Sequence, residues 1–425
     1  MKRSLAIRAG REDVKRAGFF DRFFLEIAGL VPRASDLHIG GLLLLGGTPP
    51  PFPVLRDYLA GQAAKVPVLG YRLTGTKRGG WEPAPEFDPL GHVAEARLAP
   101  GTDVLAAGLT VMERPLPSGR PLWELVMLHG YAEDEYALCY RAHHAFQDGV
   151  GLVHTAAALL SDSGPEGTWQ GPASARGRSA LWTWRTLTDH GVPLSRAADW
   201  APFSSPLTGR RVLLPVRLDA RPLNAVAAAT GATVHQACLA VLTGAIRDLA
   251  PLGEVTDRRA GRRFQIAVPL NLRTADELSE PGNYLGLLRV SLPCAEPSPV
   301  RQLERIVAQT GRARMIRHRE LHRRALDVLP YPAAKRLMQQ FAERRYITMA
   351  VSTLRVEPAA LGGTVIRGLY AFPPLLPGHH GMIIILQQPD NVTFSLLFDE
   401  SVAGVERLPG LIERSADRLH QAATS

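Results

Sequence analysis

The chain has 425 residues, of which 46% are hydrophobic and 21% are charged. This length and composition exclude a disordered polyelectrolyte and predict two or three domains, or one large two-lobed body. The net charge of +9 suits an anionic substrate or membrane surface. No basic run is interleaved with aromatic residues as in nucleic-acid modules. We therefore expect no nucleic-acid partner.

The first 165 residues mix strand and helix signals without a regular order. Apolar runs bounded by glycine are typical of buried strands, and apolar residues at helical spacing predict helices. Two of the strands are joined by a polar turn, which predicts a hairpin. Strands are expected over 37–45, 87–98, 121–130 and 136–144, and helices over 101–113 and from Gly149 onward.

A segment rich in Gly, Pro and Ser follows, over residues 163–179. It predicts an N-terminal lobe over 1–165, a linker or crossover over 166–200 and a C-terminal lobe over 201–425. Strands and helices mix throughout, which predicts an α/β or α+β fold in two lobes. In the second lobe, strands are expected over 210–219, 262–273, 287–294 and much of 346–399, and helices over 220–231, 233–250, most of 299–345 and from about 404 onward.

Features that bear on the cell compartment point to a cytoplasmic protein. The three cysteines lie far apart in apolar segments, as free buried thiols in a reducing compartment do. The basic N-terminus lacks the apolar core of a signal peptide, and no apolar run reaches the roughly 18 residues of a membrane-spanning helix. The arginine-rich segment 312–329 favours packing against the second lobe, and peripheral membrane contact is the alternative.

Two adjacent histidines lie in RAHHAFQDGVG, residues 141–151, at a predicted strand-to-helix junction. Neighbours on a strand point to opposite faces, so one imidazole is expected to face a cleft. Imidazole titrates near neutral pH and can accept and return a proton. We therefore predict His144 as the catalytic base, with His143 packed on the other side.

Asp148 and Gly149 complete this HHxxxDG pattern. Asp148 can orient the imidazole directly, or it can pair with a distant arginine and lock the junction. Gly149 allows a close approach that a Cβ would block. The chain lacks a serine or cysteine nucleophile motif, which favours direct attack by a substrate hydroxyl or amine. A metal site is disfavoured because Gly149 interrupts a continuous helix, and a chance pattern or a core histidine stays open.

Segments on both sides of the motif resemble those of one family, in order along nearly the whole chain. They are LHIGGLLLL (37–45), FDPLGHV (87–93), RPLWELVML (120–128), HHAFQDGVG (143–151), GATVHQACLAVLTGAIR (231–247), VPLNLR (268–273), GNYLG (282–286), LYAFPPLLPG (369–378) and VTFSLLFDE (392–400). The chain resembles the bacterial wax ester synthase/acyl-CoA:diacylglycerol acyltransferase (WS/DGAT) family. This family lies within the superfamily of chloramphenicol acetyltransferase-like (CAT-like) and nonribosomal-peptide condensation domains.

The resemblance implies two CAT-like lobes, each a mixed sheet with helices, with the active-site channel at their interface. It implies that His144 takes the proton of an acceptor hydroxyl that attacks an acyl thioester. It also implies that Asp148 is structural and pairs with an arginine, for which Arg273 is our candidate.

The chain departs from the family pattern in three motifs. His235-Gln236 stands where the family has Asn-Asp, and Ser352-Thr353 where it commonly has Ser-Asn. The segment PLTGRR, which begins at Pro206, lacks the Asn that often follows the Leu. These changes, His235 and Gln236 above all, predict adaptation to another acceptor. The candidates for an oxyanion donor or substrate-positioning group are Asn283, Ser352 and Asn271.

The resulting prediction is an O-acyltransferase that moves a fatty acyl group from acyl-CoA to an alcohol, with no metal and no cofactor beyond the thioester co-substrate. The alternative is a transferase of the same fold with an acyl-carrier-protein partner as donor, or with a secondary-metabolite alcohol or amine as acceptor. A second alternative is a non-catalytic lipid-binding relative, against which the intact His144 and Asp148 argue.

Overall fold

The computed structural model describes residues 15–31, 33–74, 79–117, 119–160, 197, 200–250, 264–343, 346–357 and 364–425. The chain forms two compact units. Unit 1 comprises residues 1–169, 273–284 and 358–374, and unit 2 comprises residues 170–272, 285–357 and 375–425.

The units therefore differ from the boundaries drawn on the sequence. Residues 273–284 and 358–374 fall within the predicted C-terminal lobe but belong to unit 1. The physical reason is pairing: residues 366–372 add a strand to a sheet of unit 1, and Gly282 N–H donates to the Phe146 carbonyl. Most of the predicted linker over 166–200 lies outside the described residues.

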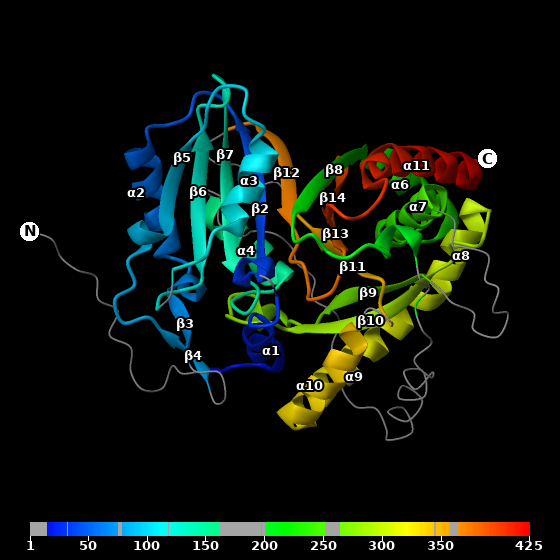
Figure 1. Cartoon of the computed structure of the whole chain (residues 1–425), viewed down its shortest axis with the longest axis horizontal. Helices are drawn as coiled ribbons and strands as arrows, with labels where there is room; N and C mark the ends of the chain where they lie inside the picture. Colours follow the sequence, from blue (N-terminus) through cyan, green and yellow to red (C-terminus); the bar gives the residue numbers. More distant parts are fainter. Residues whose placement is uncertain are drawn as a thin grey trace, which may run out of the picture. The chain divides into compact units, whose positions relative to one another are not determined.

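A five-stranded sheet forms the frame of unit 1 (Figure 1). All neighbouring strands are antiparallel except the last two, which are parallel. The strands lie in the order β12 (Ile366–Phe372), β2 (His38–Gly46), β7 (Glu135–His143), β6 (Trp123–His129) and β5 (Val93–Arg97).

Helices cover both faces of this sheet, which explains the continuous apolar run of β2. Leu43 and Leu45 pack in one buried cluster with leucines of α2 (Phe52–Ala63) and α4 (Gly149–Leu160). Leu42 points the other way, toward Gly108 of α3 (Val104–Glu113), where an added Cβ would meet its Cδ1 at 3.5 Å. Neighbours alternate in a strand, so a strand covered on both faces is apolar throughout.

Two of the family-like segments pack on each other in this sheet. The imidazole of His92 stacks on Trp123 at 4.4 Å, and its Nδ1 donates to the Trp123 carbonyl at 2.9 Å. The strand predicted over 87–98 begins only at Val93. A 3₁₀ turn over Pro89–His92 precedes it, because Asp88 caps the turn by accepting from Leu90 N–H at 3.1 Å.

A small antiparallel sheet of three strands, which the sequence patterns did not predict, also belongs to unit 1. Its order is β1 (Lys15–Arg16), β4 (Gly80–Pro83) and β3 (Tyr71–Thr74). Helix α1 (Phe19–Ile27) follows β1 and buries Phe20, Phe23 and Phe24 together with the carboxylate of Asp21. This buried acid is part of the site described below.

Unit 2 is built on a six-stranded mixed sheet. Its strands lie in the order β10 (Leu285–Leu292), β9 (Phe264–Asn271), β11 (Met349–Arg355), β13 (Gly381–Gln387), β14 (Asn391–Asp399) and β8 (Arg211–Asp219). The β9–β11 and β11–β13 pairs are parallel, and the others are antiparallel.

Three helices of unit 2 pack against α7 (Val234–Leu249), which is buried along most of its length (Figure 1). They are α6 (Ala220–Thr230), α8 (Pro299–Thr310) and α11 (Leu408–Thr424). Thr233 caps α7, as predicted, by accepting from Gln236 N–H at 3.2 Å. Helix α6 is followed by Gly231, whose φ of +69° requires the left-handed conformation that glycine tolerates. Two further helices of this unit are α9 (Arg312–Val328) and α10 (Tyr331–Ala342).

Both units mix sheets and helices, which confirms the predicted α/β class. Among the described residues, none of the helices is by itself long and apolar enough to cross a membrane. The helices Ala220–Thr230 and Val234–Leu249 are joined by a sharp bend. They reach the length and hydropathy of a membrane span only when the two are taken together.

Candidate active site

His144 lies one residue beyond the end of β7, in the turn that leads to α4. Its backbone N–H donates to the Leu37 carbonyl at 2.9 Å, which fixes the turn against β2. Its half-buried imidazole stacks on Phe24, with ring centroids 4.0 Å apart and planes 20° apart. Burial lowers the pKa of His144 below 6.5, although a hydrogen bond to its own backbone, the charge of Asp148 and a hydrogen bond to Asn283 act in the other direction. The ring is therefore neutral at pH 7.

One nitrogen of this ring is occupied by Asn283. Nδ1 of His144 lies 3.0 Å from Oδ1 of Asn283. The amide nitrogen of Asn283 faces the carbonyls of His144 at 2.8 Å and Ala145 at 3.2 Å, and Asp21 Oδ1 at 3.0 Å. These partners accept, so the amide oxygen must be the atom on the imidazole side, and Nδ1 must carry the proton. The lone pair is then on Nε2, which within the described residues has no hydrogen-bond partner.

Asp21 holds Asn283 in this orientation. Its Oδ1 accepts from the backbone N–H of Asn283 at 2.7 Å as well as from the side-chain amide. Its Oδ2 accepts from Gly18 N–H at 2.8 Å and from the indole N–H of Trp81 at 2.9 Å. Burial raises the pKa of Asp21, and these donors oppose the rise. All four contacts are N–H donors, which suits a carboxylate and leaves no place for a carboxyl proton.

Asp148 does not orient the imidazole directly. Its two oxygens lie 3.1 and 3.0 Å from Nε of Arg273, which is fully buried. They also accept from Gly151 N–H at 2.7 Å and from Tyr284 N–H at 2.9 Å. The first of these contacts caps α4, and the second holds the segment that carries Asn283. Asp148 is therefore fully occupied by structural contacts.

Arg273 ties the same segment together from the other side. Its guanidinium donates to the carbonyls of Glu277, Glu280 and Gly282, and its carbon lies 4.6 Å from the centre of the Tyr284 ring. A parallel bridge joins Gln147 to Gly282. The Asp148–Arg273 pair thus fixes residues 277–284 beside the HHxxxDG motif.

A close approach of the kind expected at Gly149 is observed at Gly151. A Cβ on Gly151 would lie 2.9 Å from Nη2 of Arg273. Gly149 is the first residue of α4, and its role stays a prediction. Gly151 makes room for the buried arginine.

His143 is buried on the α3 side of the sheet, opposite the face that holds Tyr140 and Ala142. Its Nδ1 accepts from the Ala145 N–H at 3.1 Å. Its ring meets that of His38 edge to face at 6.0 Å. Burial lowers its pKa to about 3, and the neighbouring His38 and His144 act in the same direction. A buried neutral imidazole of this kind supports the turn and does not exchange protons near pH 7.

Four of the predicted residues belong to unit 2. Asn271 ends β9, where it pairs with Leu285, and Ser352 lies in β11, where it pairs with Ile384. His235 Nδ1 lies 2.8 Å from Thr353 Oγ1, so the two departures from the family pattern contact each other. Gln236 has a structural role, because its oxygen accepts from Thr233 N–H at 2.7 Å and its nitrogen donates to Thr310 Oγ1 at 2.9 Å. Gln236 is therefore not free to select a substrate.

The prediction of Asn283 as an oxyanion donor needs correction. Its amide nitrogen already donates to three oxygens, all within 3.2 Å, so it has no hydrogen left for a reaction intermediate. The sequence patterns also missed Asp21 and Phe24. An acid between two pairs of phenylalanines in the helix sequence FFDRFFLEI was the available signal, since a buried carboxylate requires specific partners.

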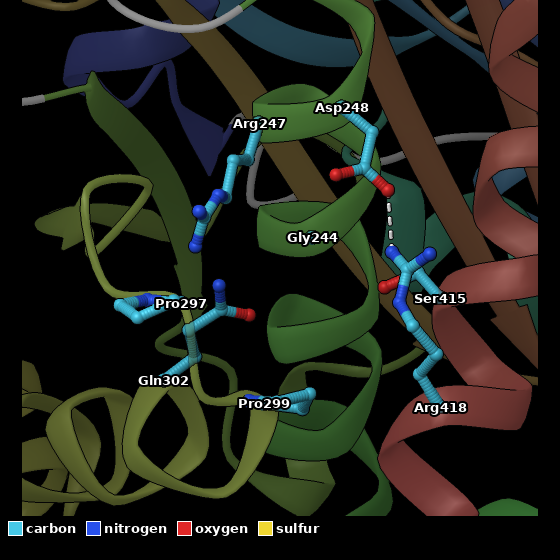
Figure 2. A pocket seen from close by; sticks show the side chains of 8 residues that line it. All are labelled: Gly244, Arg247, Asp248, Pro297, Pro299, Gln302, Ser415 and Arg418. Atoms are coloured by element: carbon cyan, nitrogen blue, oxygen red, sulfur yellow. Dashed lines mark hydrogen bonds and ion pairs between the residues drawn. The ribbon is translucent and has the colours of Figure 1, made fainter.

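A separate pocket of about 190 Å³ lies in unit 2, among α7, α8 and α11 (Figure 2). The Asp248–Arg418 ion pair lines one side, and Arg247 and Gln302 line the other. Its lining is mostly polar, which does not suit an acyl chain. Among the described residues, no group of three or more His, Cys, Asp and Glu side chains could hold a metal ion.

Two family models match the sequence. The catalytic-domain model of wax ester synthase/diacylglycerol acyltransferase matches residues 21–183, and the model of the C-terminal WS/DGAT domain matches residues 281–420. A probable diacylglycerol O-acyltransferase of Mycobacterium tuberculosis is 24% identical over 92% of each chain. A putative enzyme of the same name from Mycobacterium bovis is 26% identical over 85% of this chain and 82% of its own.

Solved structures show the same fold at lower identity. The wax ester synthase/diacylglycerol acyltransferase of Marinobacter aquaeolei matches with a TM-score of 0.61 and 18% identity, over 96% of this chain and 99% of its own. The starter condensation domain of rhizomide synthetase matches with a TM-score of 0.66 and 14% identity, over 97% and 95% of the two chains.

The solved structures show a fold shared with condensation domains, and the family models define the chain as an acyltransferase. Together the two family models cover well over half of the sequence. The chain belongs to the wax ester synthase/diacylglycerol acyltransferase family.

Proposed function

We propose that this protein transfers a fatty acyl group from an acyl-CoA thioester to an alcohol hydroxyl, with His144 as the general base. The observation that carries the proposal is the hydrogen bond between His144 Nδ1 and Asn283 Oδ1. It places the proton on Nδ1 and leaves a lone pair on Nε2. The lowered pKa keeps this lone pair available at neutral pH.

In the proposed reaction, Nε2 of His144 takes the proton of the acceptor hydroxyl while its oxygen attacks the thioester carbonyl carbon. The tetrahedral intermediate collapses, the carbon–sulfur bond breaks, and the thiolate takes the proton back from the imidazolium. The products are the ester and free CoA thiol, and His144 is again neutral. The described residues contain no nucleophile placed on His144, which favours this direct attack over a covalent enzyme intermediate.

Named relatives support the class of substrates. The mycobacterial relatives are named as diacylglycerol O-acyltransferases, and one structural neighbour was solved in complex with C8-CoA. An alcohol acceptor and an acyl-CoA donor are accordingly our first choices. No protein cofactor or metal enters the proposed reaction.

The direct test offers the purified protein a panel of acyl-CoAs with fatty alcohols, diacylglycerol and small alcohols. Free thiol release and product mass are measured together, which separates ester formation from thioester hydrolysis. We expect ester formation in the wild type and a loss of about 10²- to 10⁴-fold in His144→Ala, the usual contribution of a general base. His129→Ala, which removes a histidine of β6 paired with Glu95, is the matched control and should keep wild-type turnover. Undiminished turnover in His144→Ala would refute the base.

A second candidate is a transferase that uses a carrier-protein-bound donor, or an amine or secondary-metabolite alcohol as acceptor. Its support is the structural match to condensation domains of peptide synthetases. The site does not distinguish these acceptors, because Nε2 of His144 can deprotonate either a hydroxyl or an amine. Comparing turnover of the same acyl group on CoA and on an acyl-carrier protein, each with an alcohol and an amine, decides between the two.

A further inference from the structure

Asn283 and Asp21 form a hydrogen-bonded chain that ends on the imidazole of His144. The chain runs from the Asp21 carboxylate through the Asn283 amide to Nδ1 of His144, with heavy-atom distances of 3.0 Å at both steps. Asp21 and Asn283 are buried, at 2% and 8% exposure. These residues are separated by 262 positions in sequence, so their meeting is a property of the folded unit.

We propose that Asp21 and Asn283 are positioning residues that hold His144 in the Nδ1-protonated tautomer, and that Asp21, not Asp148, is the carboxylate that orients the catalytic base. This inference rests on the proposed base function of His144. It adds the residues that set which nitrogen of the ring takes the substrate proton.

The side-chain amide of Asn283 cannot exchange the positions of its oxygen and nitrogen without losing hydrogen bonds. In the observed orientation its nitrogen meets three acceptors and its oxygen meets one N–H. In the opposite orientation the oxygen would face the Asp21 carboxylate and the carbonyls of His144 and Ala145, where no donor remains. Buried polar groups left without partners cost about 1–3 kcal/mol each. The amide therefore has one stable orientation, and the tautomer of His144 follows from it.

Asp21 is needed because every one of its contacts is a donor. An asparagine at this position would have to point its NH₂ group either at Asn283 or at the N–H groups of Gly18 and Trp81. Both choices set donor against donor. Asp21→Asn is thus expected to release the Asn283 amide even though the side chain keeps its size.

The test measures the tautomer and the kinetics on the same full-length protein labelled with ¹⁵N-histidine. Long-range ¹H–¹⁵N spectra distinguish a protonated Nδ1 from a protonated Nε2, and His144→Ala assigns the signal by its loss. We expect the Nδ1-protonated form in the wild type. Asn283→Ala should populate the other tautomer and lower kcat by about 10- to 100-fold, with KM changed by less than about threefold, because base orientation and not binding is lost.

Asn391→Ala is the matched control, because Asn391 is also buried, at 9% exposure, and lies in unit 2. It should leave the tautomer and kcat at their wild-type values. Asp21→Asn guards against loss of fold in the alanine variant, because its side chain keeps its size and residue 283 is unchanged. It should shift His144 toward the Nε2-protonated tautomer and lower kcat, and a change of ring tautomer is something that a merely structural role would not produce.

Two results would overturn the inference: a wild-type His144 protonated on Nε2, or an Asn283→Ala variant with unchanged tautomer and kcat. Failure of the proposed function looks different. In that case His144→Ala keeps its turnover, whatever the spectra show about the ring.

Discussion

Nε of Arg273 lies 3.1 and 3.0 Å from the two carboxylate oxygens of Asp148, and both side chains are buried. The pair joins the HHxxxDG motif to the segment that carries Asn283. Asp148 and Arg273 are 125 residues apart in the sequence. Its effect on the reaction is therefore indirect: it fixes the residue that orients His144.

Arg273→Ala should cost about 3–5 kcal/mol in the free energy of unfolding, because it leaves the Asp148 charge buried without its partner. It should also lower turnover by displacing Asn283. Arg210→Ala removes an exposed ion pair with Glu400, whose side chains are 74% and 43% exposed, and should cost under about 1 kcal/mol. Denaturant unfolding and acyl transfer of both variants provide the comparison. Equal, small losses in the two would contradict a central role for the Arg273 pair.

The pH dependence of turnover follows from the lowered pKa of His144. A general base works when it is neutral, so under the proposed function the acid limb of kcat/KM should have its midpoint below pH 6.5. The measurement is kcat/KM from about pH 4 to pH 9, with the uncatalysed hydrolysis of the thioester subtracted. A profile already half-reduced at or above pH 6.5 would show that the ring is not desolvated as described.

The pH dependence of stability follows from His38 and His143. Burial lowers their pKa values to about 4 and about 3, whereas an unfolded chain protonates histidine near 6.5. Between these values the unfolded state binds more protons, so their contribution is complete above pH 6.5 and is lost as the pH falls toward 4 and 3.

His38→Gln isolates one part of this effect. A glutamine can still donate to the Met112 carbonyl, which His38 Nδ1 contacts at 2.8 Å, but it does not titrate. The difference in unfolding free energy between wild type and variant should shrink as the pH falls below 6.5. A difference that is constant with pH would rule out this assignment.

Gly282 should tolerate no side chain. Its φ is +90°, and a Cβ would lie 2.6 Å from Oδ2 of Asp21. Gly282→Ala should thus incur the left-handed strain of about 1–2 kcal/mol and also displace Asp21, with a loss of turnover. Gly378→Ala has a similar φ of +75° and open space, so it should incur the strain alone and keep its activity. Thermal unfolding measures the strain in each variant, and acyl transfer measures the turnover. Equal activity in the two variants would show that Asp21 has no role in the site.

His235 and Thr353 should be energetically coupled through their 2.8 Å contact. In a double-mutant cycle of His235→Ala and Thr353→Val, the interaction energy in unfolding should be about 0.5–1.5 kcal/mol. Thr230→Val, which removes a hydroxyl bonded to the Val226 carbonyl, is the control partner and should be additive with His235→Ala. Additivity in both cycles would mean that the His235–Thr353 contact contributes no coupling energy to stability.

The sequence supports some of these features better than others. Strand and helix positions followed from apolar spacing, as for β2 and for α7 with its Thr233 cap. The pairing of Asp148 with Arg273 came only from the family resemblance, because 125 residues separate them and no local pattern joins them. Asp21 was missed because its partners, Trp81 and Asn283, are equally remote.

The orientation of an amide lies beyond any sequence pattern. Asparagine at position 283 could be named as a polar candidate, but its amide can serve as donor or acceptor toward a neighbour. Only the acceptors gathered around its nitrogen, on Asp21, His144 and Ala145, decide which. This is why a predicted oxyanion donor became a hydrogen-bond acceptor for Nδ1 of His144.

The discontinuity of unit 1 has a consequence for biosynthesis. On the ribosome, β2 at residues 38–46 emerges long before its edge partner at residues 366–372, and the HHxxxDG turn emerges long before Asn283. Until residues 366–372 are synthesised, the nascent chain therefore exposes an unpaired edge of β2, a state prone to association. Because Nδ1 of His144 gains its Asn283 partner only after residue 283 is translated, the histidine site is expected to be completed late in synthesis.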